Sequence, residues 1–227
     1  MSKLLVFRNI LILLPYRIYS YKFYTKNLNI GVVLKKYSIP AVVFAGGKSS
    51  RMGKDKSLLP FGGFPTLIEF QFSKLKKIFN KVYISWKSEK VDLGKDVSIF
   101  DIEPNIFAPT IGLLSIFDKL ESEYIFIFSV DAPFFGEREI GKVMDTFQNH
   151  IGEYEIYIPQ HREGLEPMIG IYSRKLYPKI AHMVQDGNHK LKSLISNSKV
   201  LKIDFDEVEP FTNLNYWNEY QKARDRI

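Results

Sequence analysis

The stretch from Ala41 to Leu59, AVVFAGGKSSRMGKDKSLL, constrains the fold of this chain more than any other. It begins with a short apolar run, Ala41 to Phe44, which predicts a buried strand bounded by turn residues. Gly46 and Gly47 follow, and because glycine has no side chain, the backbone there can approach a ligand closely. The pattern therefore predicts a strand that leads into a ligand-facing loop.

The composition of this loop indicates the kind of ligand. Backbone N–H groups in such a loop can cradle phosphate oxygens. Arg51 adds a forked donor and Lys56 a mobile point charge, the two usual ways to hold polyphosphate. Neither the dinucleotide fingerprint Gly-x-Gly-x-x-Gly nor the full P-loop pattern Gly-x-x-x-x-Gly-Lys-Ser/Thr is present. We interpret the loop as a triphosphate grip; the alternative is a solvated basic loop whose glycines only make turns.

The ordered string from Ala45 to Gly53 resembles the signature Ala-Gly-Gly-x-x-x-Arg-Met-Gly of the sugar-nucleotide-type nucleotidyltransferases. Its extension, Lys54 to Leu59, is similar to that of the molybdenum cofactor guanylyltransferases, which join GMP from GTP to molybdopterin. The resemblance covers about residues 39–225. It implies GTP and molybdopterin or molybdenum-molybdopterin as substrates, Mg²⁺ as cofactor, and transient contact with proteins that mature molybdoenzymes.

The resemblance also implies which residues form the site. The residues expected to bind the nucleotide are Phe44, Ala45, Gly46, Gly47, Lys56, Asp101 and Asp131. Arg51 and Lys56 are expected to act in catalysis by neutralising the charge of the triphosphate, and Asp131 by binding Mg²⁺. The attacking phosphate would already be anionic, so the reaction requires no general base, and the four histidines show no metal-ligand spacing.

Asp131 follows a nearly continuous apolar run, Tyr124 to Val130, which predicts a central parallel strand covered on both faces. With Pro133 and Phe134 it resembles the Asp-x-Pro-Phe element of the family. Magnesium prefers hard oxygen ligands and keeps several waters, so one or two carboxylates plus substrate phosphates suffice. A charge at such a dry edge would be costly without a metal or a donor. The alternative is an Asp that caps the next helix.

Asp101 follows the predicted strand that ends at Phe100, and the family has an Asp at the matching place. Its carboxylate would contact the nucleotide, for example by accepting from guanine N1–H and N2–H₂. The segment Ala108 to Gly112 resembles the Gly-Pro-Leu-x-Gly element of the family in part. A helix beginning there would favour an anion at its N-terminus, although a plain helix cap also explains these residues.

Two later elements imply contacts on the pterin side. Glu166 and Pro167 stand where many family members have His-Pro-Thr. Asn213 and Asn215 resemble the family's Asn-x-Asn-Thr-Pro element, with Tyr-Trp in place of Thr-Pro. The two asparagines would bind a substrate phosphate or only cap the last helix.

Apolar periodicity after the loop predicts strands alternating with helices. Strands are expected over residues 81–86, 97–100, 124–130, 155–159, 168–172 and 200–204. Helices are expected over residues 66–79, 109–120, 137–147, 176–184, 190–195 and 215–226. This alternation predicts an α/β fold of three layers with a doubly wound, mostly parallel sheet, the Rossmann-like nucleotidyltransferase fold. In such sheets ligands bind beyond the carboxyl ends of the strands.

Residues 1–38 are expected to be a basic, tyrosine-rich extension outside a nucleotidyltransferase domain of residues 39–227. Residues 1–40 contain seven basic and no acidic residues, so the rest of the chain, whose total net charge is +7, is formally neutral. That part is therefore not expected to present a basic face for nucleic acid. The apolar stretch Leu4 to Leu14 is shorter than the ~20 residues of a membrane span and lacks a clean signal-peptide cleavage site. The alternative is an arm that lies on an anionic membrane surface.

The chain has no cysteine, which excludes a thiolate nucleophile and fits a reducing cytoplasm. We therefore expect a cytoplasmic guanylyltransferase that forms the molybdopterin guanine dinucleotide and pyrophosphate. Three alternatives stay open: a sister nucleotidyltransferase using CTP or another nucleotide, a nucleotide-binding module without turnover, and a membrane-surface adaptor.

Overall fold

The computed structural model describes residues 4–7, 10–13, 36–47 and 52–226. The chain divides into two compact units, residues 1–35 and residues 36–227. In the first unit β1 (Leu4–Phe7) pairs antiparallel with β2 (Ile10–Leu13). The apolar stretch near the N-terminus therefore contains two paired strands. No helix in the described ranges is long and apolar enough to cross a membrane.

The second unit is built on one twisted sheet. Its strands, in spatial order, are β10 (Val200–Asp204), β7 (Ile156–His161), β9 (Ile169–Ser173), β6 (Tyr124–Ser129), β3 (Ala41–Phe44), β4 (Val82–Trp86) and β5 (Ser98–Phe100). A two-residue strand, β8 (Gly164–Leu165), pairs with β7. All neighbours on this path are parallel except β9, which runs antiparallel to both β6 and β7. The prediction of a mostly parallel sheet is confirmed.

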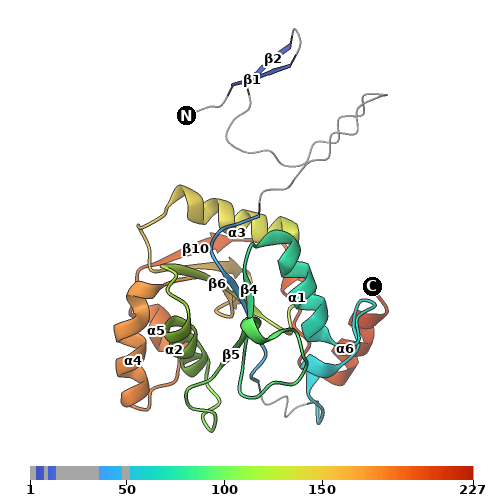
Figure 1. Cartoon of the computed structure of the whole chain (residues 1–227), viewed down its shortest axis with the longest axis vertical. Coiled ribbons are helices and arrows are strands. Elements are labelled where there is room, and N and C mark those ends of the chain that lie inside the picture. The colour runs from blue at the N-terminus through green and yellow to red at the C-terminus, as the bar shows by residue number, and fades with distance from the viewer. Residues whose placement is uncertain (1–3, 8–9, 14–35, 48–51, 227) are drawn as a thin grey trace. The chain divides into compact units, whose positions relative to one another are not determined.

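Helices cover both faces of this sheet (Figure 1). One face carries α1 (Leu67–Ile78), α3 (Glu137–Asn149) and α6 (Trp217–Arg224). The other face carries α2 (Pro109–Lys119), α4 (Tyr177–Gln185) and α5 (Leu191–Ser196). The three predicted layers are therefore present, and each predicted strand and helix has its counterpart in this unit, with bounds shifted by a few residues at most.

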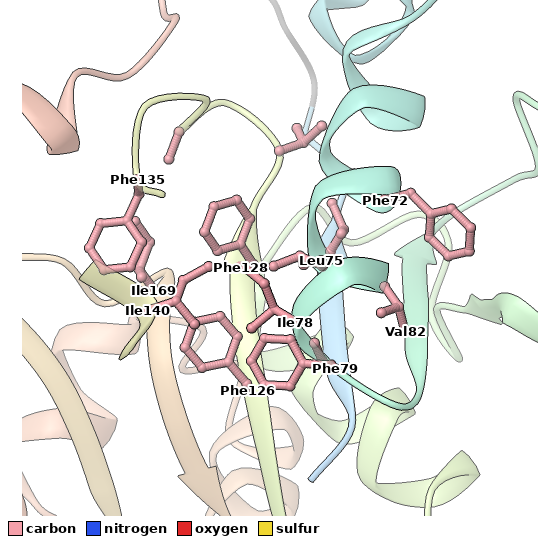
Figure 2. Close-up of a cluster of buried hydrophobic side chains, with 14 of the residues drawn as sticks. Phe72, Leu75, Ile78, Phe79, Val82, Phe126, Phe128, Phe135, Ile140 and Ile169 are labelled. Atoms are coloured by element: carbon pink, nitrogen blue, oxygen red, sulfur yellow. The ribbon is translucent and has the colours of Figure 1, made fainter. Parts of the chain in front are cut away.

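The central strand β6 shows why its sequence is apolar throughout. Side chains alternate between the two faces of a strand, so Phe126 and Phe128 enter the core beneath α1 and α3. Ile125 and Ile127 enter the core beneath α2 and α4. Figure 2 shows the first of these cores, with Leu75 of α1 beside Phe128. A strand buried on both faces cannot alternate with polar residues.

The order of the strands positions the functional edge. From β3 the chain moves outward to β4 and β5, and then returns to place β6 on the opposite side of β3. The strand order therefore reverses between β3 and β6, and ligands of open α/β sheets bind beyond the carboxyl ends at such a point. The loop after Phe44 and the turn after Ser129 both leave the sheet there.

Candidate nucleotide and metal site

A cavity of about 330 Å³ opens at this edge of the sheet. It brings together all seven residues predicted to bind the nucleotide: Phe44, Ala45, Gly46, Gly47, Lys56, Asp101 and Asp131. They come from four segments: the end of β3 with the loop after it, the loop before α1, and the turns after β5 and β6. Residues distant in sequence thus meet at one place, as the fold predicted.

The glycine loop presents its backbone to this cavity. Ala45 continues the ladder of β3, since its N–H donates to the Ser85 carbonyl at 2.9 Å. Beyond Ala45 the loop leaves the ladder and lines the cavity. A Cβ on Gly46 would lie 3.8 Å from Asp101 Oδ2, and one on Gly47 would meet nothing within 4 Å. Residue 51, the predicted catalytic arginine, lies outside the described residues, as do residues 48–50.

A short 3₁₀ turn, Lys56–Leu58, orients the lysine of the loop. Asp55 caps this turn, because its Oδ1 accepts from Ser57 N–H at 3.1 Å and from Ser57 Oγ at 2.7 Å. Lys90 Nζ lies 2.7 Å from the other oxygen of Asp55. Burial alone would raise the pKa of Asp55, but the hydrogen bonds from Lys90 and Ser57 outweigh it and lower the pKa. The carboxylate is therefore held in its charged, capping form.

Lys56 reaches across the cavity to Asp131. Its ammonium forms an ion pair with Asp131 Oδ2 and lies 3.4 Å from Asn215 Oδ1. Ser129 Oγ donates to the other carboxylate oxygen, Oδ1. The Asp131 carboxylate therefore has two donors, Lys56 and Ser129. With these donors present, its burial does not carry the cost that an unpaired charge would have.

Asp131 does not cap a helix. Residues 130–136 lie outside any helix or strand, and the next helix, α3, begins at Glu137 with Gly136 as its N-cap. The carbonyl of Asp131 accepts from Leu214 N–H at 2.9 Å, which ties this turn to the segment before α6. The helix-cap alternative for Asp131 is therefore wrong.

The same holds for Asn215. The N-cap of α6 is Tyr216, and the Glu219 carboxylate accepts from the backbone N–H groups of Asn215 at 2.7 Å and Tyr216 at 2.9 Å. The side-chain oxygen of Asn215 instead faces Lys56. Asn213 is not among the described residues that line the cavity.

Asp101 and Lys87 form a second carboxylate–cation pair, with 3.6 Å between Oδ2 and Nζ. Lys87 also donates to the Pro104 carbonyl at 2.8 Å and lies over the Phe107 ring. Burial raises the pKa of Asp101, and the charge of Lys87 opposes this rise. Asp101 Oδ1 is buried and accepts no hydrogen bond from any described residue. The Asp101 side chain nevertheless lines the cavity, so its carboxylate lies beside the space that a ligand would occupy.

Glu166 lies beside the cavity rather than in its lining. Its Oε1 accepts from His161 Nε2 at 3.0 Å, and His161 Nδ1 accepts from Glu163 N–H at 3.2 Å. Burial raises the pKa of Glu166, the hydrogen bond from His161 lowers it, and the nearby charge of Asp131 raises it further. Pro167 accepts from the Tyr172 hydroxyl through its carbonyl, and the next residue, Met168, lines the cavity.

Two lysines of the site were not predicted. Lys87 directly follows β4, so its place at the carboxyl end of a parallel strand was a usable signal. Lys90 lies in an irregular segment and donates to the Ala45 carbonyl at 3.0 Å, which no local pattern indicates. In the described ranges no group of three or more His, Asp or Glu side chains is arranged to hold a metal ion.

Comparison with known proteins identifies the family. A model described as the MobA-like NTP transferase domain matches residues 41–202. The chain belongs to this family. The molybdenum cofactor guanylyltransferase of Campylobacter jejuni (strain RM1221) is 32% identical to it over 186 residues, which cover 82% of this chain and 95% of the relative. The protein of the same name from Helicobacter pylori (strain J99 / ATCC 700824) is 29% identical over 191 residues, 82% and 88% of the two chains.

A comparison with solved structures shows the same fold. The crystal structure of molybdopterin-guanine dinucleotide biosynthesis protein A from Archaeoglobus fulgidus matches with a TM-score of 0.68 at 18% identity, covering 83% of this chain and 98% of that one. The predictions of a nucleotidyltransferase enzyme and of its Rossmann-like fold are confirmed.

Proposed function

We propose that this nucleotidyltransferase transfers GMP from GTP to the terminal phosphate of molybdopterin or molybdenum-molybdopterin. The observation that carries the proposal is the cavity between β3 and β6, where the glycine loop, Lys56 and Asp131 converge. The names of the C. jejuni and H. pylori relatives support guanylyl transfer over other reactions of the fold.

The donor set at Asp131 fits a divalent cation. The Asp131 carboxylate and the Asn215 amide oxygen are hard ligands, and both face the same ammonium group, that of Lys56. A positive charge between these two oxygens marks a position where a cation is favoured. Magnesium needs only one or two such protein ligands, because it keeps waters and binds phosphates. Bound with the nucleotide, Mg²⁺ would neutralise charge on the phosphate oxygens.

The rest of the cavity would hold the nucleotide. Backbone N–H groups of Gly46 and Gly47 would bind the triphosphate, with Arg51 as an added cation. Asp101 would accept from the base through its carboxylate, because guanine offers two adjacent donors for such a group. Glu166, with Pro167, and Asn213 would lie on the acceptor side, where the pterin phosphate approaches.

The reaction is an in-line displacement. An oxygen of the molybdopterin phosphate attacks the α-phosphorus of GTP, a new P–O–P linkage forms, and the bond to the β-phosphate breaks to release pyrophosphate. No proton has to be removed from the nucleophile, because it is an anion at neutral pH. Catalysis is then positioning and charge neutralisation. Lys56 would neutralise the charge that grows on the leaving pyrophosphate.

The test is direct synthesis of the product. Incubation of the protein with Mg²⁺, GTP and molybdenum-loaded molybdopterin is expected to yield the guanine dinucleotide, detected by mass, together with pyrophosphate. GTP with Mg²⁺ is also expected to raise the melting temperature more than ATP, CTP or UTP does, because a ligand that binds only the folded state stabilises it. Product from CTP but not GTP would reassign the protein to a sister activity.

Three expectations on the setting of the reaction belong to the same proposal. We place the reaction in the cytoplasm, where the cysteine-free chain needs no oxidising environment. The transferase domain is expected to work without the N-terminal extension. Maturation proteins of molybdoenzymes are expected to receive the product through transient contact.

A further inference from the structure

Two polar side chains of α1 reach the turn that carries Asp131. Gln71 is fully buried, and its Nε2 donates to the Val130 carbonyl at 2.9 Å. Lys74 lies one helical turn further on, and its Nζ donates to the carbonyls of Pro133 at 3.1 Å and Phe135 at 3.0 Å. Residues three apart on a helix share one face, so both side chains leave α1 toward the same segment.

This arrangement is not what packing alone favours. The Lys74 ammonium lies 4.7 Å from the centre of the Phe128 ring and 5.5 Å from that of Phe70. Burial lowers the pKa of Lys74 to about 7, while the charge of Glu139 on α3 opposes this change. Gln71 Oε1 is buried and accepts no hydrogen bond from any described residue. Burying an amine and a half-satisfied amide costs free energy that an apolar side chain would not.

The contacts concentrate on one stretch of main chain. Residues 130–136 connect β6 to α3 and belong to neither element, so the carbonyls of Val130, Pro133 and Phe135 take part in no helix or sheet ladder. Gln71 donates to the carbonyl of Val130, which precedes Asp131, and Lys74 donates to the carbonyls of Pro133 and Phe135, which follow it. Figure 2 shows the surrounding apolar packing, with Phe128 from the strand before this segment, Phe135 from within it, and Leu75 of α1 beside Phe128.

We propose that Gln71 and Lys74 are positioning residues, which clamp the main chain on both sides of Asp131 and so fix the carboxylate for the metal–nucleotide complex. The inference rests on the proposed role of Asp131 as the metal ligand. Groups that orient a metal ligand without touching the metal typically contribute 10–100-fold to metal affinity or activity.

The test separates the metal's contribution from the nucleotide's. GTP affinity is measured by calorimetry with and without Mn²⁺, and the ratio of the two affinities reports the metal alone. In Lys74→Met we expect this ratio to fall about 10-fold or more, with metal-free GTP affinity unchanged. Lys77→Met, an exposed lysine of the same helix, is the matched control and should keep the wild-type ratio. An unchanged ratio in Lys74→Met would overturn the proposal.

A second variant covers a failure to fold. Gln71→Met removes the other contact while keeping the side-chain volume, and it should lower the same ratio; if thermal unfolding shows that Lys74→Met is unfolded, Gln71→Met decides. A double-mutant cycle on turnover gives a further test. If Lys74 acts through Asp131, Lys74→Met should not lower the turnover of Asp131→Asn any further, whereas additive losses would contradict the clamp. If the wild type forms no dinucleotide, the proposed reaction fails, but the Mn²⁺ ratio still tests the clamp.

Discussion

Lys56 and Asp131, 75 residues apart in the chain, form an ion pair at the point where the strand order of the sheet reverses. The ammonium also lies 3.4 Å from Asn215 Oδ1. In the proposed reaction both members of the pair have other partners, Lys56 the triphosphate and Asp131 the metal. Binding of the metal–nucleotide complex therefore exchanges one internal ion pair for two contacts with the substrate, and the charges need not be solvated in between.

The first prediction concerns Lys56. Lys56→Ala is expected to lower turnover about 10²-fold or more, the scale of removing one preorganised charge-stabilising group. GTP binding should weaken less, because the charge that Lys56 meets grows as pyrophosphate leaves. Steady-state kinetics and calorimetry of GTP binding measure the two effects. Lys54→Ala, which removes an exposed cation of the same loop, serves as the control. Equal losses in binding and turnover would mean that Lys56 is only a grip.

The second prediction concerns GTP binding by Asp101. Because burial raises its pKa, lowering the pH protonates Asp101 earlier than an ordinary aspartate, whose pKa is 3.8. The carboxylate then loses its ability to accept from the base, so GTP affinity should fall. Asp101→Asn should bind GTP more weakly at neutral pH and lack this pH dependence. The ratio of the wild-type GTP affinity to that of Asp101→Asn is free of the titration of GTP itself. If this ratio does not change with pH, Asp101 does not bind the base.

The same pKa shift predicts a change in stability. A carboxyl group whose folded-state pKa is raised stabilises the fold fully below its unfolded pKa, and this contribution is lost as the pH rises through the folded pKa. In the wild type, the unfolding free energy should therefore fall as the pH rises above about 3.8. Asp101→Asn should lack this fall. Urea unfolding of both proteins at a series of pH values measures it. Parallel curves would mean that Asp101 keeps its ordinary pKa.

How far the sequence predicts this site depends on the range of the interactions. The glycine loop and Asp131 are found from local patterns, because each directly follows an apolar strand and therefore lies at the carboxyl edge of the sheet. The contacts of Lys56 are not, since it meets Asp131 and Asn215 only through tertiary structure. Sequence alone also left a helix cap open for Asp131, which the start of α3 at Glu137 excludes.

The clamp illustrates the same limit. Periodicity placed Gln71 and Lys74 within a predicted helix, but a polar residue on a helix usually faces solvent, and nothing local shows that these two face the turn after β6. Strand β9 was likewise predicted as a strand, but the sequence did not predict that it runs antiparallel to its neighbours β6 and β7. Strand direction follows from the connections, which single-strand patterns do not contain.

The next prediction concerns the N-terminal segment. The second compact unit begins at Lys36, and Tyr37 belongs to it: its N–H donates to the Ile78 carbonyl at 2.9 Å, its carbonyl accepts from Asn80 N–H at 3.0 Å, and its ring lies 5.6 Å from that of Phe79. A chain lacking residues 1–35 should keep the wild-type melting temperature and guanylyl transfer. Its formal net charge should fall from +7 to +1, because this segment holds six basic residues and no acidic one.

A chain lacking residues 1–38 is the matched comparison, because it also loses Tyr37. Two backbone hydrogen bonds and one aromatic contact are together worth about 2 kcal/mol, which lowers the melting temperature by roughly 4–8 °C in a domain of this size. Differential scanning fluorimetry of the two truncated chains measures the difference. Loss of soluble, folded protein on removal of residues 1–35 would show that the extension is needed for the core.

The last prediction concerns Asp131 itself. Asn has nearly the same shape as Asp without the charge, so Asp131→Asn should preserve the fold and sharply lower Mg²⁺-dependent turnover. From the sequence alone, an unpaired charge at this edge would be costly, but Asp131 is paired, and its replacement leaves the Lys56 ammonium without that partner. We therefore expect a melting temperature at or below that of the wild type. Asp204→Asn, at the exposed end of β10 in the same sheet, is the control. Near-normal turnover of Asp131→Asn at limiting Mg²⁺ would sink the metal-ligand assignment.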